Sequence, residues 1–357
     1  MSEQISNRDY AAIRHALLTG VSVMALMGCV SCADMARAED ASHPILWLEI
    51  DGQYSQLEDS ASVFAPSFIS ASPFDGISHL GLEKGPAISW DSGGKITFQP
   101  EGSDWYFMLG ARYGKSSRDG TRDEHPPTVG LTKYSGHYYN AYQNFAAQRT
   151  ESHTILDFQA GKDFGLGWFG HEGSSVLGGG IRVAQFNSRS HVAINSQPAN
   201  IYGYTIHDKF HADFAAKRKF SGVGPSLSWD ASAKLFGNPE AGRISFDWGA
   251  NGAVLFGRQQ VGGHHQQTES AYGDIYGRFA HTNIYRHDTP IARSKNVVIP
   301  NLGGFGGLSW RYPNAKVSIG YRADFFFGAM DGSIDTAHRE NAGFYGPFAA
   351  VSVGLGG

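Results

Sequence analysis

The chain has 357 residues, of which 46 are glycine, 13% are aromatic and 17% are charged. Glycine is nearly twice as frequent as in ordinary globular proteins. The formal net charge of −4 provides no basic surface for nucleic acid, which is therefore excluded as a partner. A mean hydropathy of −0.29 and the lack of a run of about 18 apolar residues exclude a helical membrane protein. Neither criterion detects membrane β-strands, because half of their residues face inward and need not be apolar.

Residues 1–38 predict a secretory signal peptide. Basic residues precede an apolar stretch, and Ala36-Arg37-Ala38 offers an A-x-A cleavage site. Two alternatives stay open, an internal membrane anchor and lipidation at Cys29. Both cysteines precede the predicted cut, so the mature domain, residues 39–357, has none. It therefore needs no disulfide, thiolate metal site or cysteine nucleophile.

The clearest predicted hairpin covers residues 222–256. Its first strand contains Leu227-Ser228-Trp229, and its second repeats the same alternation with Phe246-Asp247-Trp248. A period of two separates two environments across a strand, whereas it cannot place an apolar stripe on a helix. The pattern predicts lipid on one side of the sheet and a polar lumen on the other.

Ten strands are predicted along the chain, joined alternately by short turns and long polar loops. They cover residues 45–54, 87–98, 105–116, 152–162, 176–188, 220–235, 243–258, 297–312, 315–327 and 344–355. Short turns follow the second, fourth, sixth and eighth strands, as the periplasmic turns of bacterial barrels do. We therefore predict an all-β fold, a closed antiparallel transmembrane β-barrel of about ten strands. Twelve are possible if residues 134–145 and 201–214 form further or extended strands.

Backbone chemistry favours closure of this sheet. In hydrocarbon every N–H and C=O must be paired, and only a closed sheet leaves no edge. Trp105, Trp310 and Tyr312 lie at strand ends beside the short turns, where amphipathic rings contact lipid headgroups. The alternative is a soluble secreted β-sandwich, whose strands also alternate but which does not predict the regular exchange of turn and loop.

Three segments resemble one known family. They are the turn over residues 98–105 with the following Ala111-Arg112-Tyr113-Gly114, the G-x-G-P strand opening at residues 222–225, and residues 320–327. Together they are similar to the Legionella major outer-membrane protein-like group of bacterial proteins. The resemblance implies a β-barrel in the outer membrane with a pore or surface-protein role. It supplies no catalytic residues.

Charged residues of both signs lie on the predicted inward faces of neighbouring strands. The residues predicted to line a narrow lumen or constriction are Arg112, Asp230, Arg243, Asp247, Arg322 and Asp324. One role for them is a structural network of ion pairs, which is favoured because buried charges persist only when paired. The other is a constriction that selects small polar or charged solutes.

Two other patterns are weaker. Histidines and carboxylates gather at His207, Asp208, His211 and Asp213 and again at His264-His265, and such groups can bind divalent metal. Polar loops contain these residues by composition alone, so no metal site is predicted. Residues 165–170 match G-x-G-x-x-G, but no helical pattern follows, and the dinucleotide interpretation fails. We expect no cofactor.

The leading hypothesis is a non-enzymatic outer-membrane β-barrel, acting as a narrow porin-like channel or as a structural surface protein. One alternative is an outer-membrane hydrolase with a surface Ser and His. Another is an adhesin or receptor that binds through its long loops, especially residues 259–296. The expected partners are membrane lipid and lipopolysaccharide, with small polar solutes if the lumen is open. No feature marks a subunit interface.

Overall fold

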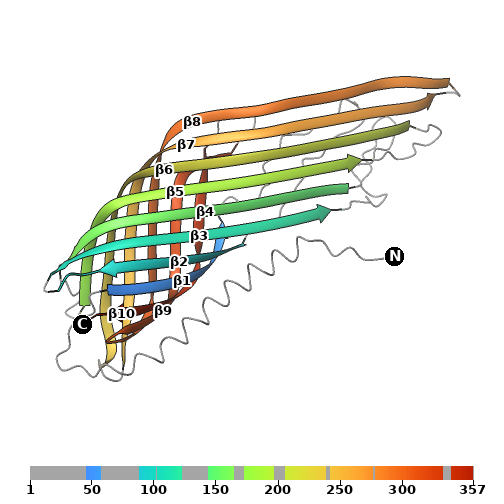
Figure 1. The fold of residues 1–357 in the computed structure, drawn as a ribbon. Coiled ribbons are helices and arrows are strands. Elements are labelled where there is room, and N and C mark those ends of the chain that lie inside the picture. Colours follow the sequence, from blue (N-terminus) through green and yellow to red (C-terminus); the bar gives the residue numbers. More distant parts are fainter. Residues whose placement is uncertain are drawn as a thin grey trace. The chain divides into compact units, whose positions relative to one another are not determined.

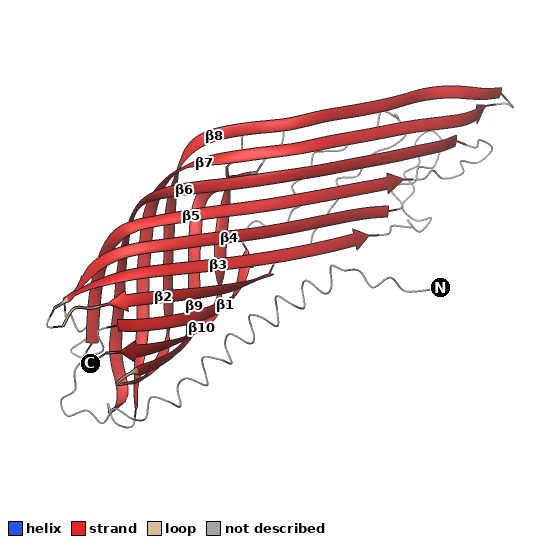
Figure 2. Cartoon of the chain, viewed as in Figure 1, coloured by secondary structure: helices blue, strands red, loops and turns tan. Residues whose placement is uncertain are grey.

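Ten antiparallel strands form a closed barrel in the computed structural model of this chain (Figure 1). The structure describes residues 46–57, 88–101, 103–122, 144–164, 173–196, 206–238, 242–275, 278–332 and 339–356. The predicted signal peptide and the glycine motif at residues 165–170 lie outside these ranges. Strands dominate the described residues (Figure 2), among which no helix is long and apolar enough to cross a membrane.

Each strand pairs with its neighbours in the sequence, and the first pairs with the last. The strands are β1 (Leu46–Leu57), β2 (Ile88–Phe98), β3 (Trp105–Arg122), β4 (Asn144–Asp163), β5 (Gly173–Ser196), β6 (Ile206–Asn238), β7 (Gly242–Ile275), β8 (Arg278–Tyr312), β9 (Ala315–Asp331) and β10 (Arg339–Leu355). The predicted ten-stranded closed antiparallel barrel is confirmed. Closure leaves no unpaired edge where lipid would surround the sheet.

The strands β3 to β8 are longer than predicted. Residues 189–219 and 259–296 are predicted as loops, but β5 and β6 cover most of the first range and β7 and β8 most of the second. These loop predictions were wrong, because outside the hydrocarbon a strand needs no apolar outer face and its alternation disappears while its pairing continues. The alternative of extended strands is confirmed for residues 206–214.

Part of the sheet continues beyond the closed ring. The β8–β9 pairing begins at Asn301, and the β2–β3 pairing ends at Lys115. Beyond these points β3 to β8 continue as one paired sheet, and Figure 1 shows them projecting away from the ring. We call this part the extended sheet; it comprises residues 116–122, 144–151, 188–196, 206–218, 261–275 and 278–293.

The short connections lie at the opposite end of the barrel. Pro313 and Asn314 alone separate β8 from β9. At the β6–β7 connection Gly237 and Gly242 have φ angles of 98° and 96°, in the left-handed region that glycine occupies without steric cost. The tight turns therefore gather at one end, as the sequence predicted.

Large apolar side chains cover the outer surface of the ring. Leu227, Ile319 and Leu302 are 67%, 60% and 58% exposed. Water-soluble proteins rarely expose a continuous apolar surface of this kind, so it is a lipid-facing surface and not that of a soluble sandwich. We call it the apolar belt; its larger members are Leu48, Ile50, Ile96, Phe107, Leu109, Phe158, Leu177, Ile181, Val223, Leu227, Phe246, Val254, Phe256, Val298, Leu302, Leu308, Val317, Ile319 and Val351.

Aromatic side chains border the apolar belt at the end with the short turns. Trp105, Trp310 and Tyr312 are 52%, 51% and 43% exposed there. Amphipathic rings prefer the headgroup layer of a bilayer. Their exposure at the strand ends agrees with the predicted interfacial position.

Candidate functional site

The lumen is the candidate site, and strand geometry explains its polarity. Successive residues of a strand point to opposite faces, so every second residue of each strand points inward. A barrel of about this strand number has an interior just wide enough for side chains to fill. The inward residues form four layers, which follow one another from the short turns towards the extended sheet.

The turn-side charged layer lies nearest the short turns. Lys95 Nζ is 3.2 Å from Glu49 Oε1, and Ser352 Oγ donates a hydrogen bond of 2.7 Å to Glu49 Oε2. A second group centres on Asp247, whose carboxylate oxygens lie 2.7 Å from Arg311 Nη2 and 3.4 Å from Lys316 Nζ. Every one of these charges has an opposite charge in contact, as burial requires.

The middle charged layer joins strands across the lumen. Arg112 Nη1 of β3 lies 2.5 Å from Asp324 Oδ2 of β9, and Asp324 is almost fully buried. Arg322 Nη1 lies 2.8 Å from Asp51 Oδ1, and its guanidinium carbon lies 4.6 Å from the centre of the Phe348 ring. These contacts connect β1, β3, β9 and β10 across the lumen.

Arg182 completes the middle charged layer from the opposite side. Its Nε and Nη2 donate to the two carboxylate oxygens of Asp157 at 2.7 and 3.0 Å. Its Nη1 donates to Asn251 Oδ1 at 2.7 Å and to Asn301 Oδ1. A bidentate pair with further amide partners fixes the guanidinium plane, so Arg182 connects its own strand β5 to β4, β7 and β8.

An aromatic layer follows, and it spans the full width of the lumen. Phe186 of β5 lies 5.6 Å from Phe344 of β10, measured between ring centres, and 4.7 Å from Phe326 of β9. Phe220 stacks on Phe186 at 5.6 Å, and both Phe220 and Phe326 are 0% exposed. Aliphatic residues surround these rings: Leu57, Ile155, Leu255 and Ile299. Because β5 and β10 lie half the ring apart, their side chains meet across the middle of the lumen at this level.

The upper charged layer lies on the far side of the aromatic layer, towards the extended sheet. Arg149 Nη2 lies 2.6 Å from Glu151 Oε1 and 3.9 Å from Glu340 Oε1. Arg218 pairs with Glu340, and Arg293 Nη2 lies 2.8 Å from Asp331 Oδ2. A small cavity separates this layer from the aromatic layer, with Arg149, Arg218 and Glu340 on one side and Phe186 and Phe344 on the other.

A buried histidine lies against a carboxylate beside the aromatic layer. His153 Nε2 is 3.5 Å from Asp91 Oδ2, and the His153 ring lies 3.8 Å from the Phe344 ring. Ser55 and Ser89 donate hydrogen bonds of 2.5 and 2.6 Å to the two oxygens of Asp91. Since both hydroxyls bond the carboxylate and not the imidazole, the arrangement does not activate a serine nucleophile.

The structure places the predicted lumen residues on inward faces. Arg112, Asp247, Arg322 and Asp324 are members of the charged layers described above. Asp230 points inward beside Gly249, and Arg243 lies at the turn end of β7, opposite Arg311. Neither Asp230 nor Arg243 has an ion-pair partner at contact distance among the described residues. Their joint role as a constriction stays a prediction.

The sequence analysis did not identify the aromatic layer. Phe326 follows Asp324 by two residues and Phe220 follows Arg218 by two, so both share the inward parity of polar residues on their strands. That parity is the signal that could have found them. Asp91 and His153 were missed as well, because their pairing across β2 and β4 depends on Gly114 between them, where a Cβ atom would meet both side chains.

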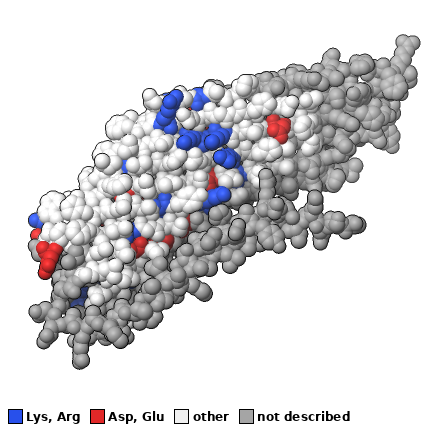
Figure 3. All heavy atoms as spheres, in the orientation of Figure 1, with Lys and Arg blue, Asp and Glu red and all other residues white. Residues whose placement is uncertain are grey.

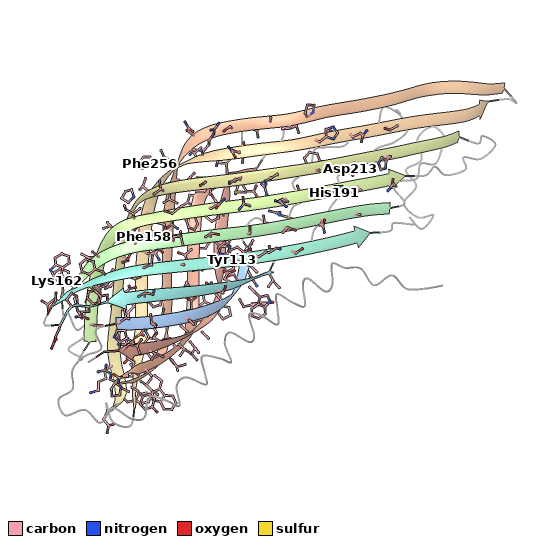
Figure 4. All side chains as sticks on the ribbon, in the orientation of Figure 1. Tyr113, Phe158, Lys162, His191, Asp213 and Phe256 are labelled. Atoms are coloured by element: carbon pink, nitrogen blue, oxygen red, sulfur yellow. The ribbon has the colours of Figure 1, made fainter. Side chains whose placement is uncertain are left out.

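Two described histidines of the extended sheet each contact one polar side chain of the adjacent strand. His191 Nε2 lies 2.8 Å from Asp213 Oδ2, and Figure 4 shows the two residues on adjacent strands. His211 Nδ1 is hydrogen-bonded to Asn195 Oδ1 at 2.6 Å. No group of three or more His, Cys, Asp and Glu side chains able to hold a metal ion occurs in the described part of the chain. The side chains of His207 and Asp208 lie outside that part.

Comparison with known proteins yields structural neighbours only. No protein-family model and no curated protein matches the chain. Solved structures that match include the transport unit of the autotransporter AIDA-I from Escherichia coli, at 8% identity over 90% of this chain and 93% of that chain, with a TM-score of 0.26. Another is the outer-membrane protein OmpT of Vibrio cholerae, at 9% identity over 89% and 99%, with a TM-score of 0.15. At these TM-scores the fold assignment rests on the barrel itself.

Proposed function

We propose that this chain is a bacterial outer-membrane β-barrel that acts as a structural surface protein with an occluded lumen. The apolar belt supports a membrane location, because only lipid would cover that surface without cost. The gathering of short turns at one end and of the extended sheet at the other supports insertion with the extended sheet outside. The family resemblance of the sequence agrees with this proposal and stays a prediction.

The contact between Phe186 and Phe344 carries the proposal of an occluded lumen. These rings come from strands half the ring apart and lie 5.6 Å from each other. Charged layers lie on both sides of them, and their carboxylates and cations are engaged with one another. An open porin instead keeps charged groups facing a water-filled passage, where solutes meet them. The geometry therefore favours the structural role over the channel.

The other hypotheses have less support. For a hydrolase, the serines that bond the buried Asp91–His153 pair are Ser55 and Ser89, which are 0% and 1% exposed and donate to the carboxylate. A substrate would have to displace the aromatic layer to reach them. For an adhesin, most of residues 259–296 belongs to paired strands of the extended sheet, which leaves less free loop than the hypothesis assumed.

Conductance in planar bilayers tests the proposal. The wild-type protein, folded in detergent and shown to be heat-modifiable on a denaturing gel, should insert without producing discrete current steps. The double variant Phe186→Ala/Phe344→Ala removes the contact across the lumen and should produce small steps. The matched control Phe158→Ala truncates a phenylalanine on the lipid side of β4 (Figure 4) and should stay silent.

Ohmic steps from the wild-type protein would contradict the occluded lumen and favour the narrow porin-like channel. Hydrolysis of an ester or peptide substrate that Ser55→Ala or Ser89→Ala abolishes would favour the enzyme instead. Failure of heat-modifiable protein to enter bilayers at all would contradict the membrane location.

A further inference from the structure

The outer face of β3 to β8 carries a group of cations directly beyond the apolar belt. We propose that this group, the cationic patch, binds the phosphate groups of a phosphorylated glycolipid in the outer leaflet, an inference that rests on the proposed membrane location. The cationic patch consists of Lys115, Arg189, Lys217, Lys219 and Arg258.

Strand register places these side chains in successive rows. The last apolar row runs across six paired strands: Ala111, Leu156, Val183, Val223, Phe256 and Val298. Two residues further along each strand, the next row contains Arg258. The second row contains Lys115 and Lys219, and the third contains Arg189 and Lys217. The change from apolar to cationic surface therefore takes place within a single row.

No carboxylate shares this surface among the described residues. The other side chains in the three rows are Tyr113, Ser117, Thr150, Ser152, Thr154, Gln185, Asn187, Ser221, Gln260, Ala292, Ser294 and Asn296, with Gly262. The first outward carboxylate along β6 is Asp213, which is already bonded to His191. Figure 3 shows the resulting gathering of blue side chains across the middle of the visible face.

Two cations of the patch lie directly opposite each other on adjacent strands. Arg189 and Lys217 are direct cross-strand partners on β5 and β6 and point to the same exposed face. Like charges directly opposite each other destabilise a sheet. The lumen shows the contrary arrangement, in which each charged layer pairs cation with carboxylate. A phosphate group between Arg189 and Lys217 would convert repulsion into two charge-assisted contacts.

The position beside the apolar belt identifies the source of the phosphate. Strands rise about 3.3 Å per residue, so the three cationic rows lie roughly 7 to 20 Å along the strands from Phe256 and Val223. A lipid whose acyl chains lie on the apolar belt would hold its headgroup at this height. Hydroxyl and amide side chains between the cations, such as those of Asn187 and Ser221, are suited to hydrogen bonds with phosphate and sugar oxygens. A free phosphate would gain nothing from the apolar belt.

Lipid retention tests the cationic patch. The full chain is folded into phosphatidylcholine vesicles with and without bisphosphorylated lipid A, extracted in mild detergent, and assayed for lipid A per barrel. Each cation near an anionic surface is worth about a fivefold change in binding, so Arg189→Gln/Lys217→Gln should retain about 25-fold less lipid A than wild type. The matched control is Lys162→Gln, which removes an exposed cation of β4 at the turn end, 3.7 Å from Asp104 (Figure 4), and should retain as much as wild type.

Thermal unfolding provides a second readout with a reversal of sign. Without lipid A, Arg189→Gln/Lys217→Gln removes a repulsion and should unfold at a slightly higher temperature than wild type. With lipid A, it should unfold at a lower temperature than wild type. Both differences should shrink in high salt, which screens exposed charges.

Equal retention of lipid A by the double variant and wild type would overturn the cationic patch as a binding site, as would equal retention of dephosphorylated lipid A by wild type. Failure of wild type to insert into plain phosphatidylcholine vesicles is a different result, because it would overturn the proposed function together with the site. If both proteins insert and the double variant retains as much lipid A as wild type, only the proposed site is overturned and the proposed function stands.

Discussion

The closed ring and the extended sheet share the strands β3 to β8, yet they distribute charge in opposite ways. In the ring, the charges of the turn-side and middle charged layers point inward and touch opposite charges, while the outer face is apolar. At the boundary between the ring and the extended sheet, the same outer face carries the cationic patch, with no carboxylate in its three rows among the described residues. The comparison teaches that the surroundings of the sheet, lipid or water, and not the strand itself, decide which face carries charge.

The largest expected difference in stability between the two regions comes from removing one partner of a lumen ion pair. Arg112→Ala leaves Asp324 buried without its cation and should lower the free energy of unfolding by about 3–5 kcal/mol. Arg258→Ala removes an arginine of the same charge from the outer face, where Ser294 Oγ accepts from its Nε, and should cost less than about 1 kcal/mol. Urea unfolding in phosphatidylcholine vesicles, followed by tryptophan fluorescence, measures both. Equal losses of unfolding free energy in the two variants would show that the buried Arg112–Asp324 pair stabilises the barrel no more than the exposed Arg258 does.

The aromatic layer predicts a second, smaller contrast between adjacent residues. Phe326 is 0% exposed and Phe327 is 44% exposed on the lipid side of the same strand. Phe326→Ala opens a cavity and should cost about 3 kcal/mol, whereas Phe327→Ala should cost well under half of that. The same urea titration distinguishes them. A larger loss for Phe327→Ala would mean that lipid packing, and not lumen packing, holds the ring together.

A third comparison concerns two glycines, one beside the buried Asp91 and His153 and one away from them. A Cβ atom at Gly114 would meet both side chains, whereas one at Gly94 would meet only the Glu49 carbonyl oxygen at 3.5 Å. Gly114→Ala should therefore cost about 1–3 kcal/mol through overpacking, and Gly94→Ala close to nothing. Heat-dependent gel mobility gives a rapid measure, since a weakened barrel unfolds at a lower temperature. Identical midpoints for the two variants would show that Asp91 and His153 move aside freely.

The ring was largely predictable from sequence, and the extended sheet was not. The predicted starts at Trp105 and Ala315 coincide with those of β3 and β9, because the apolar and polar faces differ strongly within the hydrocarbon. Residues 189–196 and 206–219 belong to β5 and β6, although both were predicted as loop. Both faces of a strand outside the membrane can be polar, so the period of two disappears although the hydrogen bonds continue.

The lumen was predictable in kind but not in its pairing. Inward parity placed Arg112, Arg322 and Asp324 on the lumen side, and that placement follows from local alternation alone. Which charge meets which depends on how far the sheet is sheared when it closes, a property of the whole ring. The contact between Phe186 and Phe344 also depends on how the ring closes, because the local sequence of neither strand indicates that the two residues lie opposite each other.

The pairing of β1 with β10 sets the order in which such a barrel can be completed. Leu46 aligns with Leu355, so the first described strand must wait for the last one before either is fully hydrogen-bonded. Contacts between such distant parts of a chain form slowly, because a long loop must close before they contribute. The unfinished chain therefore needs protection from aggregation until its final strand has arrived, and removal of β10 alone would leave the remaining nine unable to seal.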